Sequence, residues 1–121
     1  MEENYLPSLD FICGLISTGS AFMWVKQKES EVPVFQIKMQ PSQRHLLELI
    51  KSKLGLKESI YEYHYTKRRY LLILVRRRSV IENTIIPTFD GRLFGPKRDQ
   101  FETWKKKYFE KKLEFVYKHY D

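Results

Sequence analysis

The sequence predicts an α+β domain, with a four-stranded antiparallel sheet and helices on one of its faces. Its 121 residues fit one domain, residues 1–121. Hydrophobic periodicity gives the order helix, two strands, helix, two strands, helices. Each pair of strands is joined by a short polar segment, as in a hairpin, so the strands are expected to run antiparallel.

The first helix is expected to begin after Pro7, with Ser8 as its N-cap, and to end near residues 18–20. Residues 21–28 read as a strand, "KESEVP" as a polar turn, and residues 34–39 as a second strand. In the second strand apolar residues alternate with a mixed set, Val34, Gln36 and Lys38. This pattern is typical of a strand that is covered by helices on one face and exposed to solvent on the other.

The second half of the chain repeats this order. Residues 42–54 read as a helix closed by Gly55. Residues 59–78 read as two strands around a basic turn at residues 66–69. A short helix at residues 80–86 is expected to stop at Pro87, and residues 88–96 form a loop. A long helix then begins at Lys97, with an apolar stripe of Phe101, Trp104 and Tyr108.

The composition points to a polyanionic partner. Lys and Arg number 22 against 15 Asp and Glu, which gives a formal net charge of +7 and a pI near 9.5. Such a balance favours nucleic acid over a membrane surface, although solubility alone is an alternative explanation. No apolar run approaches the roughly 20 residues that span a bilayer, so we expect no membrane partner. The start of the sequence resembles neither a signal peptide nor a transit peptide.

The segment "FICGLISTGSAF", residues 11–22, resembles the motif of the LAGLIDADG homing endonucleases, F-I-A-G-L-I-D-A-D-G-S-F. The segments "PVFQIKMQPSQRHLLELIKSKLG" and "RRYLLILV" are similar to later blocks of the family. "IIPTFDGRLFGPKRDQFETWKK" resembles a stretch typical of its organellar intron-encoded members. The resemblance implies an αββαββα unit whose sheet forms a saddle over DNA.

In this family two units pack through their motif helices. The resemblance therefore implies a homodimer or another protein partner, with Gly14, Ser17 and Thr18 allowing close approach of the two helices. The alternative is that Gly14 and Ser17 simply pack against the chain's own helices.

The same resemblance implies a loss of catalysis. In the family, acidic residues of the motif coordinate divalent metals, but this sequence has Ser17 and Gly19 at the two acidic positions. Lys97 keeps the position of a lysine that assists family catalysis, which does not replace a metal ligand. The three histidines show no metal-ligand spacing, and Cys13 reads as a core residue. We therefore expect no cleavage by the family mechanism, no metal site and no cofactor.

What remains is a basic surface that can bind phosphate. Met23 and Val25 share its predicted side, and they are poor readers of a major groove. Tyr61, Tyr63 and Tyr65 alternate on one strand face, where they either stack on unpaired bases or simply pack as strand residues. The candidate nucleic-acid contacts are Lys28, Gln36, Lys38, Tyr63, Lys67, Arg68, Arg69, Arg76, Arg77, Arg78, Lys97 and Arg98.

Three functions follow from these observations. The first is an inactive relative that binds structured RNA, ribosomal or intron, as a ribosomal or maturase-like component. The second is a homodimeric homing endonuclease that cuts double-stranded DNA, and the third is a regulator that binds DNA without cutting. RNA is favoured over DNA as the partner. The organellar character of the "IIPTFD" stretch, with abundant Lys, Ile and Tyr, predicts a mitochondrial location.

Overall fold

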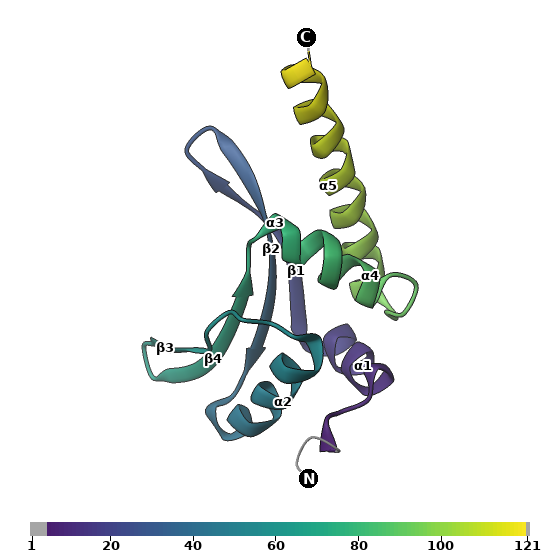
Figure 1. Cartoon of the computed structure of the whole chain (residues 1–121). Coiled ribbons are helices and arrows are strands. Elements are labelled where there is room, and N and C mark those ends of the chain that lie inside the picture. The colour runs from purple at the N-terminus through teal and green to yellow at the C-terminus, as the bar shows by residue number, and fades with distance from the viewer. Residues whose placement is uncertain (1–4, 121) are drawn as a thin grey trace.

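The fold is a four-stranded antiparallel sheet with a layer of helices, seen in a computed structural model that describes residues 5–120 and the side-chain surroundings of residues 5–114 (Figure 1). The strand order is β1-β2-β4-β3. The expected α+β class, with its antiparallel saddle-type sheet, is confirmed. The elements are α1 (Leu9–Gly19), β1 (Ser20–Gln27), β2 (Ser30–Met39), η2 (Pro41–Gln43), α2 (Arg44–Leu54), β3 (Tyr61–Tyr65), β4 (Arg68–Val75), α3 (Arg78–Val80), η3 (Ile81–Ile85), α4 (Ile86–Phe89) and α5 (Pro96–Tyr120).

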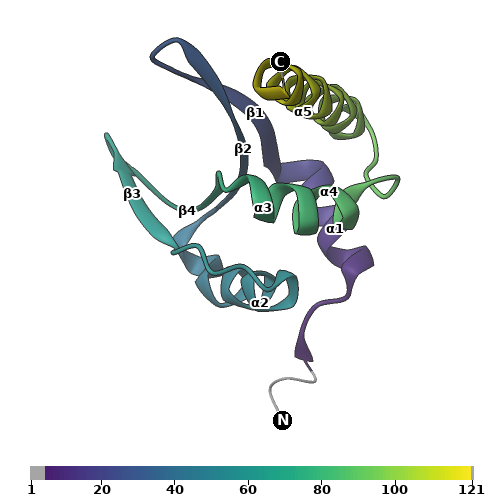
Figure 2. The same ribbon diagram turned by 45° about the horizontal axis from the view of Figure 1, so that its top comes forward.

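The helices lie on one face of the sheet, which leaves the other face open (Figure 2). The strand register explains this, because residues that pair directly across strands share a face. Phe22 pairs with Phe35, and Phe35 pairs with Val75, so these three point into the same layer. All three are buried. The side chains between them in each strand therefore point to the open face.

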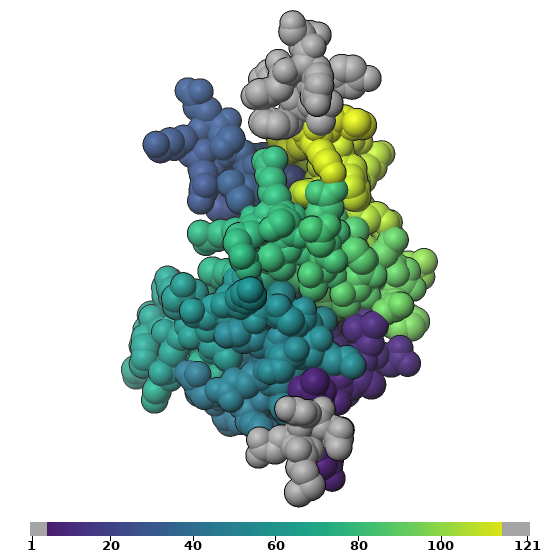
Figure 3. Space-filling view, in the orientation of Figure 1, coloured from purple at the N-terminus to yellow at the C-terminus, as the bar shows by residue number. Residues whose placement is uncertain are grey.

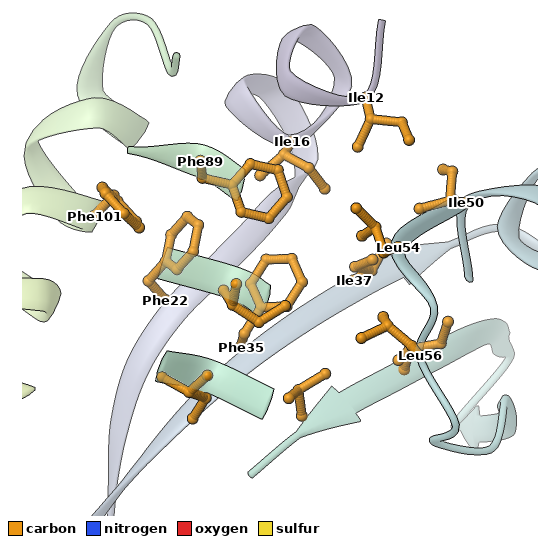
Figure 4. Packing of buried hydrophobic residues seen from close by; sticks show 14 of the residues in the cluster. Ile12, Ile16, Phe22, Phe35, Ile37, Ile50, Leu54, Leu56, Phe89 and Phe101 are labelled. Atoms are coloured by element: carbon orange, nitrogen blue, oxygen red, sulfur yellow. The ribbon is translucent and has the colours of Figure 1, made fainter. Parts of the chain in front are cut away.

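Phe22 lies at the centre of the aromatic part of the core (Figure 4). Its ring centroid is 5.1 Å from that of Phe35, 5.0 Å from Phe101 and 5.1 Å from Trp104. Phe89 completes the cluster with an edge-on ring at 6.1 Å. Burying such a side chain contributes about 1.5–3 kcal/mol. These contacts join β1, β2, α4 and α5 into one core.

The ends of α1 and α2 agree with their predicted signals. The backbone N–H of Phe11 donates to Ser8 Oγ at 3.1 Å, so Ser8 is the N-cap of α1 as expected. Gly55 ends α2 with a φ of 68°, a left-handed conformation that glycine adopts without strain.

The first hairpin turn is shorter than predicted. The predicted polar turn at residues 28–33 is wrong, because β2 begins at Ser30 and only Lys28 and Glu29 form the turn. Pro33 is tolerated in the strand because pairing with β4 starts at Phe35, so β1 is the strand neighbour of this part of β2.

The second hairpin turn is also tighter than predicted. The basic turn expected at residues 66–69 reduces to Thr66 and Lys67, and Arg68 and Arg69 belong to β4. Thr66 has a φ of 53°, the left-handed geometry that closes a two-residue hairpin turn. Because strand side chains alternate, Arg68 and Arg69 point to opposite faces of the sheet.

Pro87 does not stop the short helix, contrary to prediction. The helical segment runs from Arg78 to Phe89 and widens into a π turn, η3, at Ile81–Ile85. Pro87 lies directly after this π turn, in the first turn of α4, so the altered hydrogen-bond pattern of the π turn accommodates a residue without an N–H inside the continuous segment. Thr88 and Phe89 are therefore helical, and the loop expected from residue 88 starts at Asp90.

Three side chains of α5 bond the backbone of the edge strand β1. Lys97 Nζ donates to the carbonyl oxygen of Ser20. Gln100 Oε1 accepts the N–H of Phe22 at 2.9 Å, and Trp104 Nε1 donates to the carbonyl of Met23 at 2.9 Å. An unpaired strand edge is a site of aggregation unless it is covered. The start of α5 therefore covers the start of β1.

The middle of α5 makes a second attachment, to η3. The hydroxyl of Tyr108 donates to Glu82 Oε2 at 3.0 Å, and Lys112 also bonds this carboxylate. Burial, and secondly the hydrogen bond to Glu82, raise the pKa of Tyr108 to about 12. Neither α5 nor any other described helix has the length and apolar character needed to cross a membrane.

We expect Gln100→Ala to lower the free energy of unfolding by about 1–3 kcal/mol, because the partly buried N–H of Phe22 loses its acceptor. Gln100→Glu keeps an oxygen acceptor and is expected to retain most of the stability. Urea unfolding followed by circular dichroism measures both variants. Asp99→Ala, at the exposed neighbouring position, is the control, and an equal loss in this control would contradict the assignment.

Candidate nucleic-acid interface

The open face of the sheet carries positive charge and no carboxylate among its strand positions. Its two charged residues are Lys38, near the end of β2, and Arg68, at the start of β4. By register, the open face consists of Ala21, Met23, Val25, Gln27, Ser30, Val32, Val34, Gln36, Lys38, Tyr61, Tyr63, Tyr65, Arg68, Tyr70, Leu72 and Leu74.

Both carboxylates of the strands lie on the helix face and are paired there. Glu31 bonds Lys107 and lies 3.9 Å from Lys111, and the hydrogen bond from Lys107 lowers the pKa of Glu31. Glu62 pairs with Arg69 at 2.6 Å. The Glu31 pair links the β1–β2 hairpin to α5, and Figure 3 shows these two elements projecting at the same end of the molecule. The negative charge of the strands is thus kept away from the open face.

The tyrosines form an exposed row on the β3 side of the open face. Tyr61, Tyr63 and Tyr65 are 57%, 50% and 65% exposed. The Tyr63 ring stacks on Tyr70 of β4 with a centroid distance of 5.5 Å, and Lys38 Nζ lies 4.2 Å from the Tyr70 centroid. The prediction that the three strand tyrosines share one face is therefore confirmed. Exposed aromatic rings on a sheet are the surface on which unpaired bases stack.

A groove of about 970 Å³ crosses one end of the sheet, and we call it the end groove. It runs from the last residue of α1 to the β3–β4 hairpin, because the ends of α1, β2 and β3 and the start of β4 meet there. Cationic, aromatic and polar side chains line it, without a carboxylate. The lining residues are Gly19, Lys38, Met39, Gln40, Pro41, Ser42, Tyr65, Arg68, Arg69 and Tyr70.

The predicted contact residues divide by position. Four of them, Gln36, Lys38, Tyr63 and Arg68, lie together on the open face. Lys28 and Lys67 are exposed in the two hairpin turns. Six of the predicted contacts thus lie on the open face or in the hairpin turns that end its strands.

The structure places the other six outside the open face. Arg69 pairs with Glu62 on the helix face and also lines the end groove. Arg77 Nε donates to Glu58 at 3.2 Å at the start of α3. Arg76 is exposed beyond the end of β4. Arg78 lines a groove with charged residues of both signs from the β1–β2 hairpin and α5. Lys97 bonds the β1 backbone, while Arg98 is exposed in the first turn of α5.

Ser17 and Gly19, which the sequence resemblance aligns with acidic motif positions, carry no carboxylate. Gly19 has no side-chain oxygen. Ser17 Oγ donates to the carbonyl of Cys13 at 2.8 Å and accepts the N–H of Phe94 at 3.1 Å, so its hydroxyl is held within the chain and carries no negative charge. Among the described residues no three His, Cys, Asp or Glu side chains gather around a common point. Hard divalent cations prefer anionic oxygen ligands, and positions 17 and 19 supply none.

The exposed stripe of α1 differs from the predicted one. Gly14 and Thr18 are exposed as expected, but Ser17 is partly buried and held by Phe94, so it does not lie with them. Phe11 and Leu15 complete the stripe instead, and Phe11 is 49% exposed. A Cβ added at Gly14 would meet nothing within 4 Å, so packing within this chain does not require glycine there.

Sequence reasoning missed Phe11 and Tyr70. The spacing of Phe11, Leu15 and Thr18 on one side of a helix was a usable signal for the stripe. Tyr70 had no such signal, because its contact with Tyr63 depends on the register between β3 and β4, which the sequence alone did not fix.

Comparison with known proteins identifies the fold. Across 93% of its length the chain superposes on the I-LtrWI LAGLIDADG homing endonuclease bound to target DNA, with a TM-score of 0.77 and 30% identity. The meganuclease I-SmaMI, bound to uncleaveable DNA, matches over 83% of the chain with a TM-score of 0.71 and 25% identity. The LAGLIDADG homing endonuclease I-GzeII, in complex with a DNA target, has the same fold, with a TM-score of 0.75, 22% identity and 88% coverage of the chain.

The chain spans about two fifths of the length of these solved proteins, 39%, 35% and 38% respectively. No curated protein matches the sequence. The sequence profile of the LAGLIDADG endonuclease family matches residues 12–108, from within α1 to the middle of α5. The chain therefore belongs to the LAGLIDADG endonuclease family and has its nucleic-acid-binding fold.

Proposed function

We propose that this protein binds structured RNA on the open face of its sheet and does not cleave nucleic acid by a metal-dependent mechanism. The observation that carries the proposal is the open face itself. It combines a row of exposed tyrosines with cations and no carboxylate. Phosphate contacts supply affinity on such a surface, and unpaired bases supply stacking partners for the tyrosines.

The other half of the open face supports the choice of RNA. Met23, Val25 and Val32 are partly exposed at the positions toward the β1–β2 hairpin, and their side chains have no hydrogen-bond donor and no strong acceptor. Direct readout of duplex DNA uses donors and acceptors placed in the major groove. A surface with aliphatic residues in these positions fits recognition by shape, stacking and phosphate contact.

We also propose that the exposed stripe of α1 receives a protein partner, either a second copy of the chain or another component of a ribonucleoprotein. Phe11 and Leu15 offer apolar area, and Gly14 lets another helix approach closely. Because the solved relatives are longer than this chain, their activities are not transferred to it directly.

The second candidate function is binding of double-stranded DNA, with or without cleavage. It is favoured by the solved relatives, two of which are LAGLIDADG homing endonucleases whose structures contain target DNA. A competition experiment separates the two functions. We expect an RNA hairpin with an unpaired loop to displace a labelled probe at lower concentration than duplex DNA of matching sequence. Stronger displacement by duplex DNA would favour the second candidate.

Incubation with supercoiled plasmid and Mg²⁺ or Mn²⁺ is expected to give no nicking above the level without metal, because positions 17 and 19 supply no carboxylate. Gel electrophoresis of the plasmid measures this. A metal-dependent nicking activity that disappears in Lys97→Ala would refute the proposal, and disappearance in this variant would distinguish it from a contaminating nuclease.

Arg68→Ala is expected to weaken RNA binding and to reduce the slope of log affinity against log salt by about 0.7–0.9, the loss of one phosphate contact. Lys106→Ala removes the same charge from an exposed position of α5, which lies on the helix side of the sheet and outside the end groove. We expect a clearly smaller change in slope for Lys106→Ala. Fluorescence polarisation at four salt concentrations measures both, and equal slopes would show that the open face is not the contact surface.

A further inference from the structure

The end groove brings together the three kinds of group that hold a nucleotide. Tyr65 supplies an aromatic ring, Arg68 and Lys38 supply positive charge, and Gln40 and Ser42 supply hydrogen-bonding groups. A base that is paired in a helix already has neighbours stacked on both of its faces. A base outside a helix has free faces and can stack on a protein side chain.

We infer that the end groove binds one unpaired nucleotide without a metal ion, its base stacked on Tyr65 and its phosphate bound by Arg68 and Lys38. This inference rests on the proposed function, because it locates within the RNA-binding surface the place where a single base is held. The inference places this nucleotide at the end of the sheet, in the end groove, and not at the centre of the open face.

Tyr65 is the available ring in the groove. The ring of Tyr70 is already in contact with two side chains. Tyr63 stacks on it, and Lys38 Nζ lies 4.2 Å from its centroid. Within the described side chains no ring or cation packs on Tyr65, and it is 65% exposed. The base therefore has an unoccupied aromatic surface at Tyr65.

Arg68 is placed to bind the phosphate of the same nucleotide. It pairs directly with Tyr65 across the β3–β4 hairpin, so both side chains leave the sheet on the same face. Directly opposed strand residues have Cβ atoms about 4.5–5.5 Å apart. Among the described residues no carboxylate pairs with Arg68, whereas Arg69 is bound to Glu62. The charge of Arg68 is thus available to a ligand.

Gly19 keeps the far end of the groove free of negative charge. A carboxylate at this position would face the same space as Lys38 and would repel a phosphate in the absence of a metal. The backbone itself does not require glycine, because an added Cβ meets nothing within 4 Å and the residue has no left-handed φ. An alanine side chain is therefore accommodated at this position, and Gly19→Ala serves as the uncharged match for Gly19→Asp.

The test uses the full chain, a fluorescent eight-nucleotide single-stranded RNA and a blunt RNA duplex of the same length, in EDTA. Tyr65→Ala is expected to weaken single-strand binding by about 5- to 150-fold, the measured range for one base–aromatic stack. Tyr65→Phe keeps the ring and is expected to bind within about threefold of the wild-type protein, well below the loss of one stack. Tyr61→Ala removes a tyrosine of the same strand that lies outside the groove, so a clearly smaller loss is expected. Tyr5→Ala, at an exposed position before α1, is the control.

The second variant pair tests the charge at the far end of the groove. Gly19→Asp is expected to weaken single-strand binding in EDTA, and Gly19→Ala to leave it unchanged. Duplex affinity is expected to be insensitive to Tyr65→Ala. Equal losses in Tyr61→Ala and Tyr65→Ala, or equal binding by Gly19→Asp and Gly19→Ala, would overturn the groove assignment while leaving RNA binding intact. If the wild-type protein binds neither RNA, both the proposed function and this inference are overturned.

Discussion

The attachment of α5 to β1, by hydrogen bonds and ring packing, is the interaction on which the rest of the structure depends. Gln100 and Trp104 bond the backbone of β1, and the Phe101 and Trp104 rings pack on Phe22 in the same region. Together they close one edge of the sheet and complete the core on one side. The apolar side chains of α1, α2 and α5 are buried against the helix face of the sheet. The opposite face carries no helix in the described part of the chain (Figure 2). The surface available to nucleic acid is a consequence of this one-sided packing.

The same contacts give Lys97 a structural role. A lysine at this position assists catalysis in the family, as the resemblance in sequence implies. Here its ammonium group bonds the carbonyl of Ser20 and lies 3.4 Å from Gln100 Oε1, directly beyond the end of α1. The position of the residue is retained while the carboxylate beside it is absent. The bond of Lys97 to β1 therefore gives this residue a role in attaching α5 to the sheet.

Much of the fold could be predicted from local signals, and the exceptions have identifiable causes. Ser8, Gly55 and the stripe of Phe101, Trp104 and Tyr108 acted locally, so the sequence located them correctly. Pro33 and Pro87 were read as breaks, but their neighbours decide their effect. Pro33 lies where β4 does not pair with β2, and Pro87 lies in the first turn that follows a π turn. Such tolerance depends on tertiary pairing and cannot be read from the residue alone.

The candidate site shows the same limit more strongly. Charge and residue type identified Lys38, Tyr63 and Arg68, which the sheet brings onto one face. The run of adjacent arginines was less informative, because a one-residue step reverses the direction of a strand side chain. Arg68 and Arg69 are neighbours in sequence, yet one faces the open surface and the other neutralises Glu62. A basic run therefore predicts that a protein binds a polyanion, while the register of the strands decides which of its charges can do so.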